Sequence, residues 1–195
     1  MIPRVLLAAL LAAACSPAYS DCRAVDAAHG RVSFELEQAG APFRGSFGRF
    51  GGEVCLAGER VTKVDVWLEP ASVDAGLPEI NSALQGDDFF AVARFPRATY
   101  SSESITEKTG ELVARGTLTM KGHSAPLDAP FRLQHEGDDL VISGALTLNR
   151  LDYGIGTGDW SNTKWLGAEV RVSFRATLAQ VAGGASAQSS AASAR

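Results

Sequence analysis

Residues 168–178, with the sequence AEVRVSFRATL, alternate between apolar and polar side chains almost without interruption. Successive side chains of a β-strand point to opposite faces, so this period of two predicts one long strand with an apolar face and a solvated face. At ~3.3 Å per residue, the strand spans roughly 36 Å, about twice the usual length. An apolar face of that length must be covered, either by an ordinary core or by something that the protein carries.

The same alternation recurs along the chain. It marks further strands at residues 32–36, 43–50, 64–68, 112–120, 127–133 and 140–148, and RATYSSES at residues 97–104 adds another. Turn signals such as KTGE and HEGDD separate these runs. We therefore expect eight or nine strands in an antiparallel, all-β domain. Gly45, Gly116 and Gly144 lie at inward positions, where we expect strands to bend.

One segment breaks the strand pattern. Residues 78–90, PEINSALQGDDFF, begin with a proline, which the first turn of a helix tolerates, and place Ile80 and Leu84 four residues apart. Gly86 is expected to end the run. We interpret this segment as a short helical insert that covers one end of the sheet.

Long strands with a single apolar face either pack as two sheets or close into a barrel, and closure removes exposed edges. An eight-stranded barrel has an interior that side chains can fill or that can hold one small ligand. The expected interior positions mix Phe34, Phe47 and Phe131 with alanine, glycine and valine. The pattern alone leaves a dry core and a ligand tunnel equally open.

The two ends of the sequence differ from the middle. Residues 1–20 have one positive charge, a short apolar run and a small-residue exit, which is the layout of a secretory signal peptide. LAAAC, ending at Cys15, also resembles a lipoprotein processing site, so lipidation of Cys15 is a second interpretation. Either way we expect export, with a periplasmic location. We assign residues 21–179 to the folded domain and residues 180–195 to a low-complexity, disordered tail.

Cys22 and Cys55 remain as a pair whichever cleavage applies. In an oxidising compartment two cysteines more often form a bridge than stay free, so we expect a disulfide that ties the N-terminus of the domain to its body. The alternative interpretation is two unpaired thiols. Closing a loop of about 33 residues stabilises the fold by on the order of 3 kcal/mol.

Charge and motifs exclude several classes of function. The 195-residue chain has 18 basic and 22 acidic side chains, with the basic ones scattered, so nucleic acid is not an expected partner. The three histidines lack metal-ligand spacing, and no metal is expected. No nucleophile elbow, zinc-protease motif, phosphate-binding loop or dinucleotide fingerprint is present in the sequence, so we predict that the protein is not an enzyme.

Four stretches in order carry a resemblance to a known family. They are RVSFELEQAGAPFRGSFGRFGGEV, VDVWLEPASVDAGLPEINSALQGDDFFAVARFPRATYSS, VARGTLTMKGHSAPLDAPFRL and LTLNRLDYGIGTGDWSNTKWLGAEVRVSF. In this order the chain resembles the YceI-like family of bacterial periplasmic proteins, which are described as polyisoprenoid-binding or lipid-binding. The resemblance covers about residues 25–178. Cys22 and Cys55 are not a general feature of that family.

The resemblance implies an extended, eight-stranded antiparallel β-barrel of lipocalin-like shape, with a short helical insert near one end. It implies that the apolar lumen holds a long-chain isoprenoid or similar amphiphile as a ligand, with no further cofactor. LDYGIGTGDW resembles a subset of the family associated with quinone or b-type cytochrome systems, so an isoprenoid quinone joins polyprenyl lipid as an expected ligand. Transient contact with a membrane or a membrane protein fits this function, in a monomer or a homodimer.

We expect the ligand to contact side chains of the lumen and of its mouth. These are Phe34, Phe47, Val66, Leu84, Phe89, Phe90, Tyr100, Leu118, Phe131, Leu146, Tyr153, Trp160, Val172 and Phe174. The aromatic residues of the two loop regions have a second interpretation, since they can also plug the barrel or attach a loop to it. Arg150, in the segment NRLDYG, suits a phosphate headgroup but can equally pair with neighbouring residues.

Two alternative functions stay open. One is an accessory or structural subunit whose barrel is filled by its own side chains and which acts with a membrane partner. The other is an enzyme acting on lipids through residues near the mouth.

Overall fold

The computed structural model describes residues 21–108 and 110–179. Within them lie ten β-strands, one α-helix and three short 3₁₀ helices. The predicted signal peptide, the predicted tail and Cys15 lie outside the described residues. No helix in the described part of the chain is long and apolar enough to cross a membrane.

The strands follow one another along the chain with few interruptions. They are β1 (Asp21–Gln38), β2 (Ala41–Phe47), β3 (Phe50–Ala57), β4 (Arg60–Leu68), β5 (Val73–Asp74), β6 (Ala98–Lys108), β7 (Glu111–Met120), β8 (His123–Glu136), β9 (Asp139–Asn149) and β10 (Glu169–Leu178). The single helix is α1 (Pro78–Gln85), and the 3₁₀ helices span Pro70–Ser72, Arg150–Tyr153 and Gly158–Ser161.

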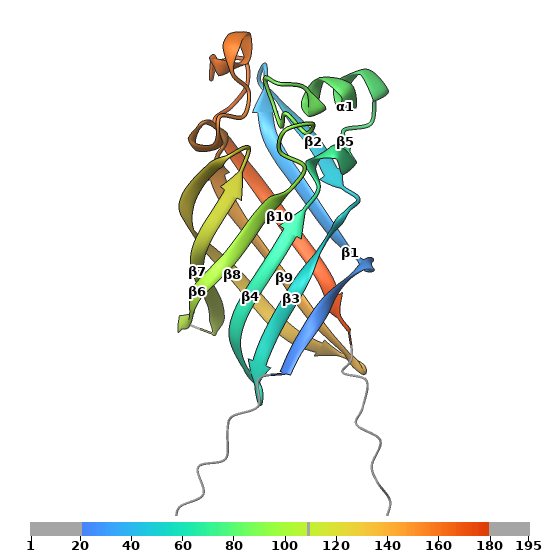
Figure 1. Cartoon of the computed structure of the whole chain (residues 1–195), viewed down its shortest axis with the longest axis vertical. Helices are drawn as coiled ribbons and strands as arrows, with labels where there is room; N and C mark the ends of the chain where they lie inside the picture. The colour runs from blue at the N-terminus through green and yellow to red at the C-terminus, as the bar shows by residue number, and fades with distance from the viewer. Residues whose placement is uncertain (1–20, 109, 180–195) are drawn as a thin grey trace, which may run out of the picture.

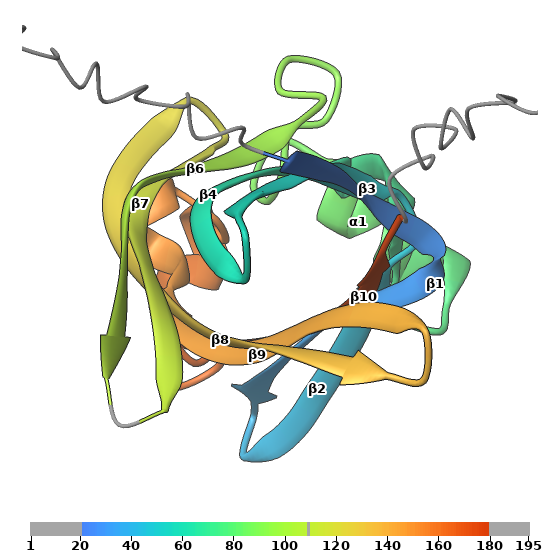
Figure 2. The same cartoon turned by 90° about the horizontal axis from the view of Figure 1, so that it is seen from below.

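Eight of these strands close an antiparallel barrel (Figures 1 and 2). Their order is β1-β3-β4-β6-β7-β8-β9-β10, and β10 pairs back onto β1. The strand expected at residues 168–178 is β10, which pairs with β9 on one edge and with β1 on the other. The predicted all-β, eight-stranded antiparallel barrel with a short helical insert is confirmed.

β1 is long enough to pair with two strands along one of its edges. Residues 21–24 pair with β3 and residues 32–38 pair with β2, while the opposite edge pairs with β10. β2 and β3 therefore occupy successive parts of the same edge of β1. The alternation in the sequence stops at Phe50 and gave no separate signal for β3, because that strand begins with two glycines after Phe50.

The inward glycines have two different roles. At Gly116 the strand does meet an irregularity: an added Cβ would lie 2.1 Å from the carbonyl oxygen of Ser101, next to the register shift in β6. Gly45 instead makes room for a ring, because a Cβ there would lie 2.4 Å from the ring of Phe34. Gly144 combines both roles: a Cβ there would lie 2.4 Å from the carbonyl oxygen of Pro130 and 2.6 Å from the ring of Phe174.

Two inserts lie at the same end of the barrel, which we call the loop end (Figure 1). The helical insert, residues 69–97, contains β5 and α1, and the glycine-rich insert, residues 150–168, contains two of the 3₁₀ helices. The helix begins at Pro78 and ends at Gln85 with Gly86 as its C-cap, as predicted. The remaining residues of the expected segment, 87–90, form turns. The described chain begins and ends at the opposite end of the barrel, which we call the terminal end.

The core divides into two clusters along the barrel. One cluster, which we call the lower cluster, lies among the barrel strands and includes Val54, Val61, Phe131 and Leu178, each at most 2% exposed. The other, which we call the upper cluster, packs barrel residues such as Phe34 against side chains of both inserts at the loop end. The loop end is thus capped by side chains of the two inserts.

Candidate ligand-binding cavity

The barrel encloses a cavity of about 290 Å³ whose wall is almost wholly apolar. Side chains from β2 and from all eight barrel strands contribute to the wall. Both inserts also reach it, through Leu84, Phe89 and Phe90 on one side and Ile155 and Leu166 on the other. The cavity therefore extends along the barrel and is bounded at the loop end by the inserts.

The apolar face of β10 lies against this cavity. Val170, Val172, Phe174 and Ala176 all line it. The long alternating strand at the end of the sequence thus has a cavity, as well as side-chain core, against its apolar face.

Twelve of the fourteen expected ligand-contacting residues line the cavity. They are Phe34, Phe47, Val66, Leu84, Phe89, Phe90, Tyr100, Leu118, Phe131, Leu146, Val172 and Phe174. Most of these come from period-two positions of strands, where the direction of each side chain follows from the alternation.

Tyr153 and Trp160 are not in the cavity wall. Tyr153 is 2% exposed and packs in the upper core cluster. Trp160 is 37% exposed, and its ring centre lies 5.5 Å from that of Phe89. These two residues hold the inserts to each other and to the barrel, which is the second interpretation that their loop position left open.

The sequence interpretation missed several residues of the wall. Leu36 and Val170 continue the alternation of β1 and β10, so the pattern contained a signal for them. Ile155 and Leu166 lie in irregular backbone of the glycine-rich insert, where no period predicts the direction of a side chain.

Aromatic rings are concentrated near the loop end of the cavity. Phe34 lies at the centre, with its ring 5.4 Å from that of Phe47 and 6.1 Å from that of Phe43. Phe90 of the helical insert meets Phe47 edge-on at 5.7 Å. Such tilted and edge-on pairs fix the position of the helical insert over the barrel.

Arg150 is buried at the base of the glycine-rich insert, with 2% of its surface exposed. Its guanidinium group donates five hydrogen bonds to backbone carbonyls, at 2.7–2.9 Å. The accepting residues are Ile155, Gly156, Trp160, Leu166 and Gly167. Burial lowers the pKa of Arg150, yet all five of its donors are satisfied. Arg150 therefore shapes the insert and has no N–H free for a headgroup.

Tyr100 places a hydroxyl group at the cavity wall. The hydroxyl donates to the carbonyl oxygen of Ala114 at 2.8 Å, and the carbonyl of Leu127 lies 3.3 Å away. Burial raises the pKa of Tyr100 to about 12. The hydroxyl is thus neutral and already engaged, and the wall around it stays apolar.

The two inserts are joined by hydrogen bonds at Asp88. The carbonyl oxygen of Asp88 accepts from the backbone N–H groups of Gly156 and Thr157, at 2.7 and 3.0 Å. The Thr157 hydroxyl adds a contact of 3.2 Å to the Asp88 carboxylate. Together with the Phe89–Trp160 ring contact, these bonds close the cap over the cavity.

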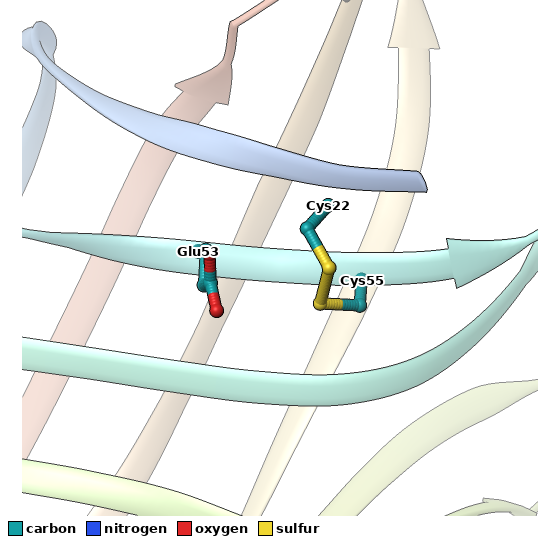
Figure 3. A group of neighbouring side chains, drawn as sticks. All are labelled: Cys22, Glu53 and Cys55. Carbon is teal, nitrogen blue, oxygen red and sulfur yellow. A yellow bond between two sulfur atoms is a disulfide. The ribbon is translucent and has the colours of Figure 1, made fainter. Parts of the chain in front are cut away.

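Cys22 and Cys55 form the predicted disulfide (Figure 3). The two residues lie directly opposite each other on β1 and β3, at the terminal end of the barrel. Glu53 lies close by, and these three residues are the group of potential metal ligands found in the described ranges. Because the two sulfurs are bonded to each other, they are not thiolates, and thiolate is the form that binds a metal.

Comparison with known families gives one match that spans the barrel. The family model described as the YceI-like domain matches residues 24–178. Among curated proteins, a UPF0312 protein of Shewanella oneidensis is 30% identical over 140 residues, covering 67% of this chain and 73% of the relative. Protein YceI of Salmonella arizonae is 32% identical over 114 residues, covering 57% of this chain and 60% of the relative.

Solved structures show the same barrel. BcnA of Burkholderia cenocepacia matches with a TM-score of 0.75 at 27% identity, over 80% of this chain and 99% of that protein. A domain from Saccharophagus degradans matches with a TM-score of 0.67 at 16% identity, over 81% of this chain and 98% of that domain. The YceI protein of Campylobacter jejuni matches with a TM-score of 0.63 at 20% identity, over 70% of this chain and 85% of that protein.

Proposed function

Since the chain belongs to the YceI-like family, we propose that it is an exported, non-catalytic carrier that holds the chain of a long isoprenoid in its barrel. The ligand is a polyprenyl lipid or an isoprenoid quinone. The observation that carries this proposal is the apolar cavity of about 290 Å³ that runs along the barrel. The Saccharophagus domain with the same fold is described as a polyisoprenoid binding domain, which agrees with this ligand class.

The driving force for binding is burial of apolar surface. Each 100 Å² of ligand surface removed from water contributes roughly 2.5 kcal/mol, before the costs of ordering the ligand are subtracted. The cavity also supports a carrier over an accessory subunit with a filled barrel, because a filled barrel has no space for a guest.

The polar groups around the cavity argue that the protein recognises the chain of the ligand more than its headgroup. The donors of Arg150 and the hydroxyl of Tyr100 are engaged by backbone carbonyls. No buried side-chain N or O atom within the described residues lacks a hydrogen-bond partner. A headgroup inside the lumen would therefore lose its hydration without gaining partners, which is unfavourable. We infer that the headgroup stays at the loop end, near Phe89 and Phe90.

The test is a variant that fills the cavity. Val172 lies midway along β10 and lines the cavity, and Val172→Trp adds a large ring to that space. We expect the affinity for a fluorescent prenyl ligand added from detergent to fall at least tenfold, since the ring occupies the volume that the chain needs. The circular dichroism spectrum should remain that of a β-barrel.

The matched control is Arg171→Trp, one residue away. Arg171 is exposed on the outer face of the same strand, so this variant adds a tryptophan without filling the cavity. Equal binding by the wild-type protein and Val172→Trp would contradict a ligand site in the lumen. Absence of prenyl-lipid binding by the wild-type protein itself would contradict the carrier function.

A further inference from the structure

The large apolar side chains exposed on the described surface are confined to the two inserts. Leu77, in the helical insert, is 55% exposed. Leu151, Trp160 and Trp165, in the glycine-rich insert, are 38%, 37% and 63% exposed. Both inserts lie at the loop end (Figure 1). The barrel wall and the terminal end have no exposed side chain of this kind among residues 21–108 and 110–179.

Trp165 is held in its exposed position by its own backbone. Its carbonyl oxygen accepts a hydrogen bond of 2.8 Å from the N–H group of Ala39, and its N–H group donates to Asn162 at 3.0 Å. The next residue, Leu166, is buried, and its carbonyl oxygen accepts from Arg150. Because this backbone is held by hydrogen bonds, the fold keeps the indole ring in solvent, although exposure of its apolar area to water is unfavourable.

This exposed surface continues into the cap of the cavity. The ring of Trp160 contacts Phe89, which lines the cavity, and the Trp160 carbonyl oxygen accepts from Arg150. The same inserts therefore have an inner face toward the cavity and an outer face with exposed apolar side chains.

We propose that the outer face of the two inserts is a docking surface for a lipid bilayer, with Trp160, Trp165, Leu77 and Leu151 inserting at the membrane–water interface. This inference rests on the proposed carrier function, since a long prenyl lipid resides in membranes and has to be collected there. Tryptophan suits this position because its ring combines a large apolar area with a polar N–H group, and it is enriched at membrane interfaces.

The charge of the inserts determines the kind of membrane contact. Residues 69–97 and 150–168 contain seven acidic and four basic residues, and one of the basic residues is the buried Arg150. Such a surface is not attracted to anionic lipid. Docking is therefore apolar, and it does not weaken as salt is raised, because screening acts on charge interactions.

The experiment measures quenching of tryptophan fluorescence by vesicles of phosphatidylcholine with brominated acyl chains and no prenyl lipid. The protein is used in a Trp67→Phe background, because Trp67 lies on the barrel under the guanidinium group of Arg97. The fluorescence then reports Trp160 and Trp165 among the described tryptophans. We expect quenching, and we expect Trp165→Ala to weaken partitioning into vesicles roughly tenfold.

A second readout separates docking from ligand binding. Trp165 is outside the cavity wall, so Trp165→Ala should bind a prenyl ligand delivered in detergent as the wild-type protein does, yet collect it from vesicles roughly tenfold more slowly. Failure of the wild-type protein to bind ligand in detergent would overturn the carrier function. Docking to the bilayer would then be tested by the quenching experiment alone.

Three results would overturn the docking surface. They are an absence of quenching, quenching that Trp165→Ala does not change, and partitioning that rises with the fraction of anionic phosphatidylglycerol. Sedimentation without vesicles tests the other occupant, a second copy of the chain. A dimer that Trp165→Ala dissociates, without vesicle binding, would assign this surface to self-association instead.

Discussion

Arg150 organises the glycine-rich insert through its side chain alone. Its five donors meet carbonyl groups from residues 155–167, and a segment without long regular structure thereby keeps one conformation. From the sequence, Arg150 could either bind a headgroup or pair with neighbouring residues. Only the folded backbone could decide, because the carbonyl groups that it binds belong to irregular loops.

We expect Arg150→Lys to destabilise the protein strongly. Lysine has three donors on a single nitrogen, so several of the carbonyl groups would remain buried without a partner. The free energy of unfolding, measured by denaturant titration, should fall by about 3 kcal/mol. Arg132→Lys is the control, since Arg132 is exposed and its nearest carboxylate, on Glu111, is 3.8 Å away. A loss at Arg150 no larger than that at Arg132 would contradict the role assigned to Arg150.

Tyr100 makes the stability depend on alkaline pH. Its pKa is about 12 in the folded protein because burial disfavours the phenolate, whereas an exposed tyrosine has a pKa of about 10. The unfolded chain therefore loses this proton first, and stability falls as pH rises from about 10 to about 12, by at most about 1.4 kcal/mol per pH unit from this group.

The comparison that isolates this effect is Tyr100→Phe against the wild-type protein. The variant should lose about 1 kcal/mol at neutral pH for the missing hydrogen bond, and its stability should fall less steeply above pH 10. Some slope should remain, since burial also raises the pKa of Tyr153. Parallel stability profiles for the two proteins above pH 10 would refute this account.

At the scale of secondary structure, the strands follow from the sequence and the connections do not. Period-two alternation gave the positions of the long strands and the inward direction of side chains such as Phe131 and Val172. It failed at β3, where glycines interrupt the pattern, and in both inserts, where no period exists. This is why Tyr153 and Trp160 were expected at the cavity wall, which they do not line, whereas Ile155 and Leu166, which do line it, were missed.

Inward glycines determine how closely the strands and rings approach each other. Gly45→Ala would place a methyl group 2.4 Å from the ring of Phe34, which lines the cavity. The ring must then move, so we expect a loss of about 1–3 kcal/mol in the free energy of unfolding and weaker binding of a prenyl ligand. Gly48→Ala is the control, because its nearest atom would be 3.8 Å away. Similar stability and binding for both variants would show that Gly45 is not needed for space.

At the scale of the whole molecule, the two ends of the barrel are built differently. The disulfide joins β1 to β3 at the terminal end, and the caps and the exposed tryptophans are at the loop end. The resemblance predicted the barrel with a helical insert near one end, and the cysteine count predicted the disulfide. The exposed outer face of the inserts was not predicted, because exposure of Trp165 depends on the backbone hydrogen bonds that hold it.

The pairing of β1 with β10 also has a consequence for how the chain reaches this structure. Val25 pairs with Leu178, so the seam joins segments near opposite ends of the described sequence. Contacts between such distant segments are slow to form, because a long loop of chain has to close first. One edge of β1 therefore stays unpaired until the final strand, β10, has been synthesised. During that interval the unpaired edge can pair with another chain. Pairing of β10 with β1 is therefore the step that protects the newly made protein from aggregation.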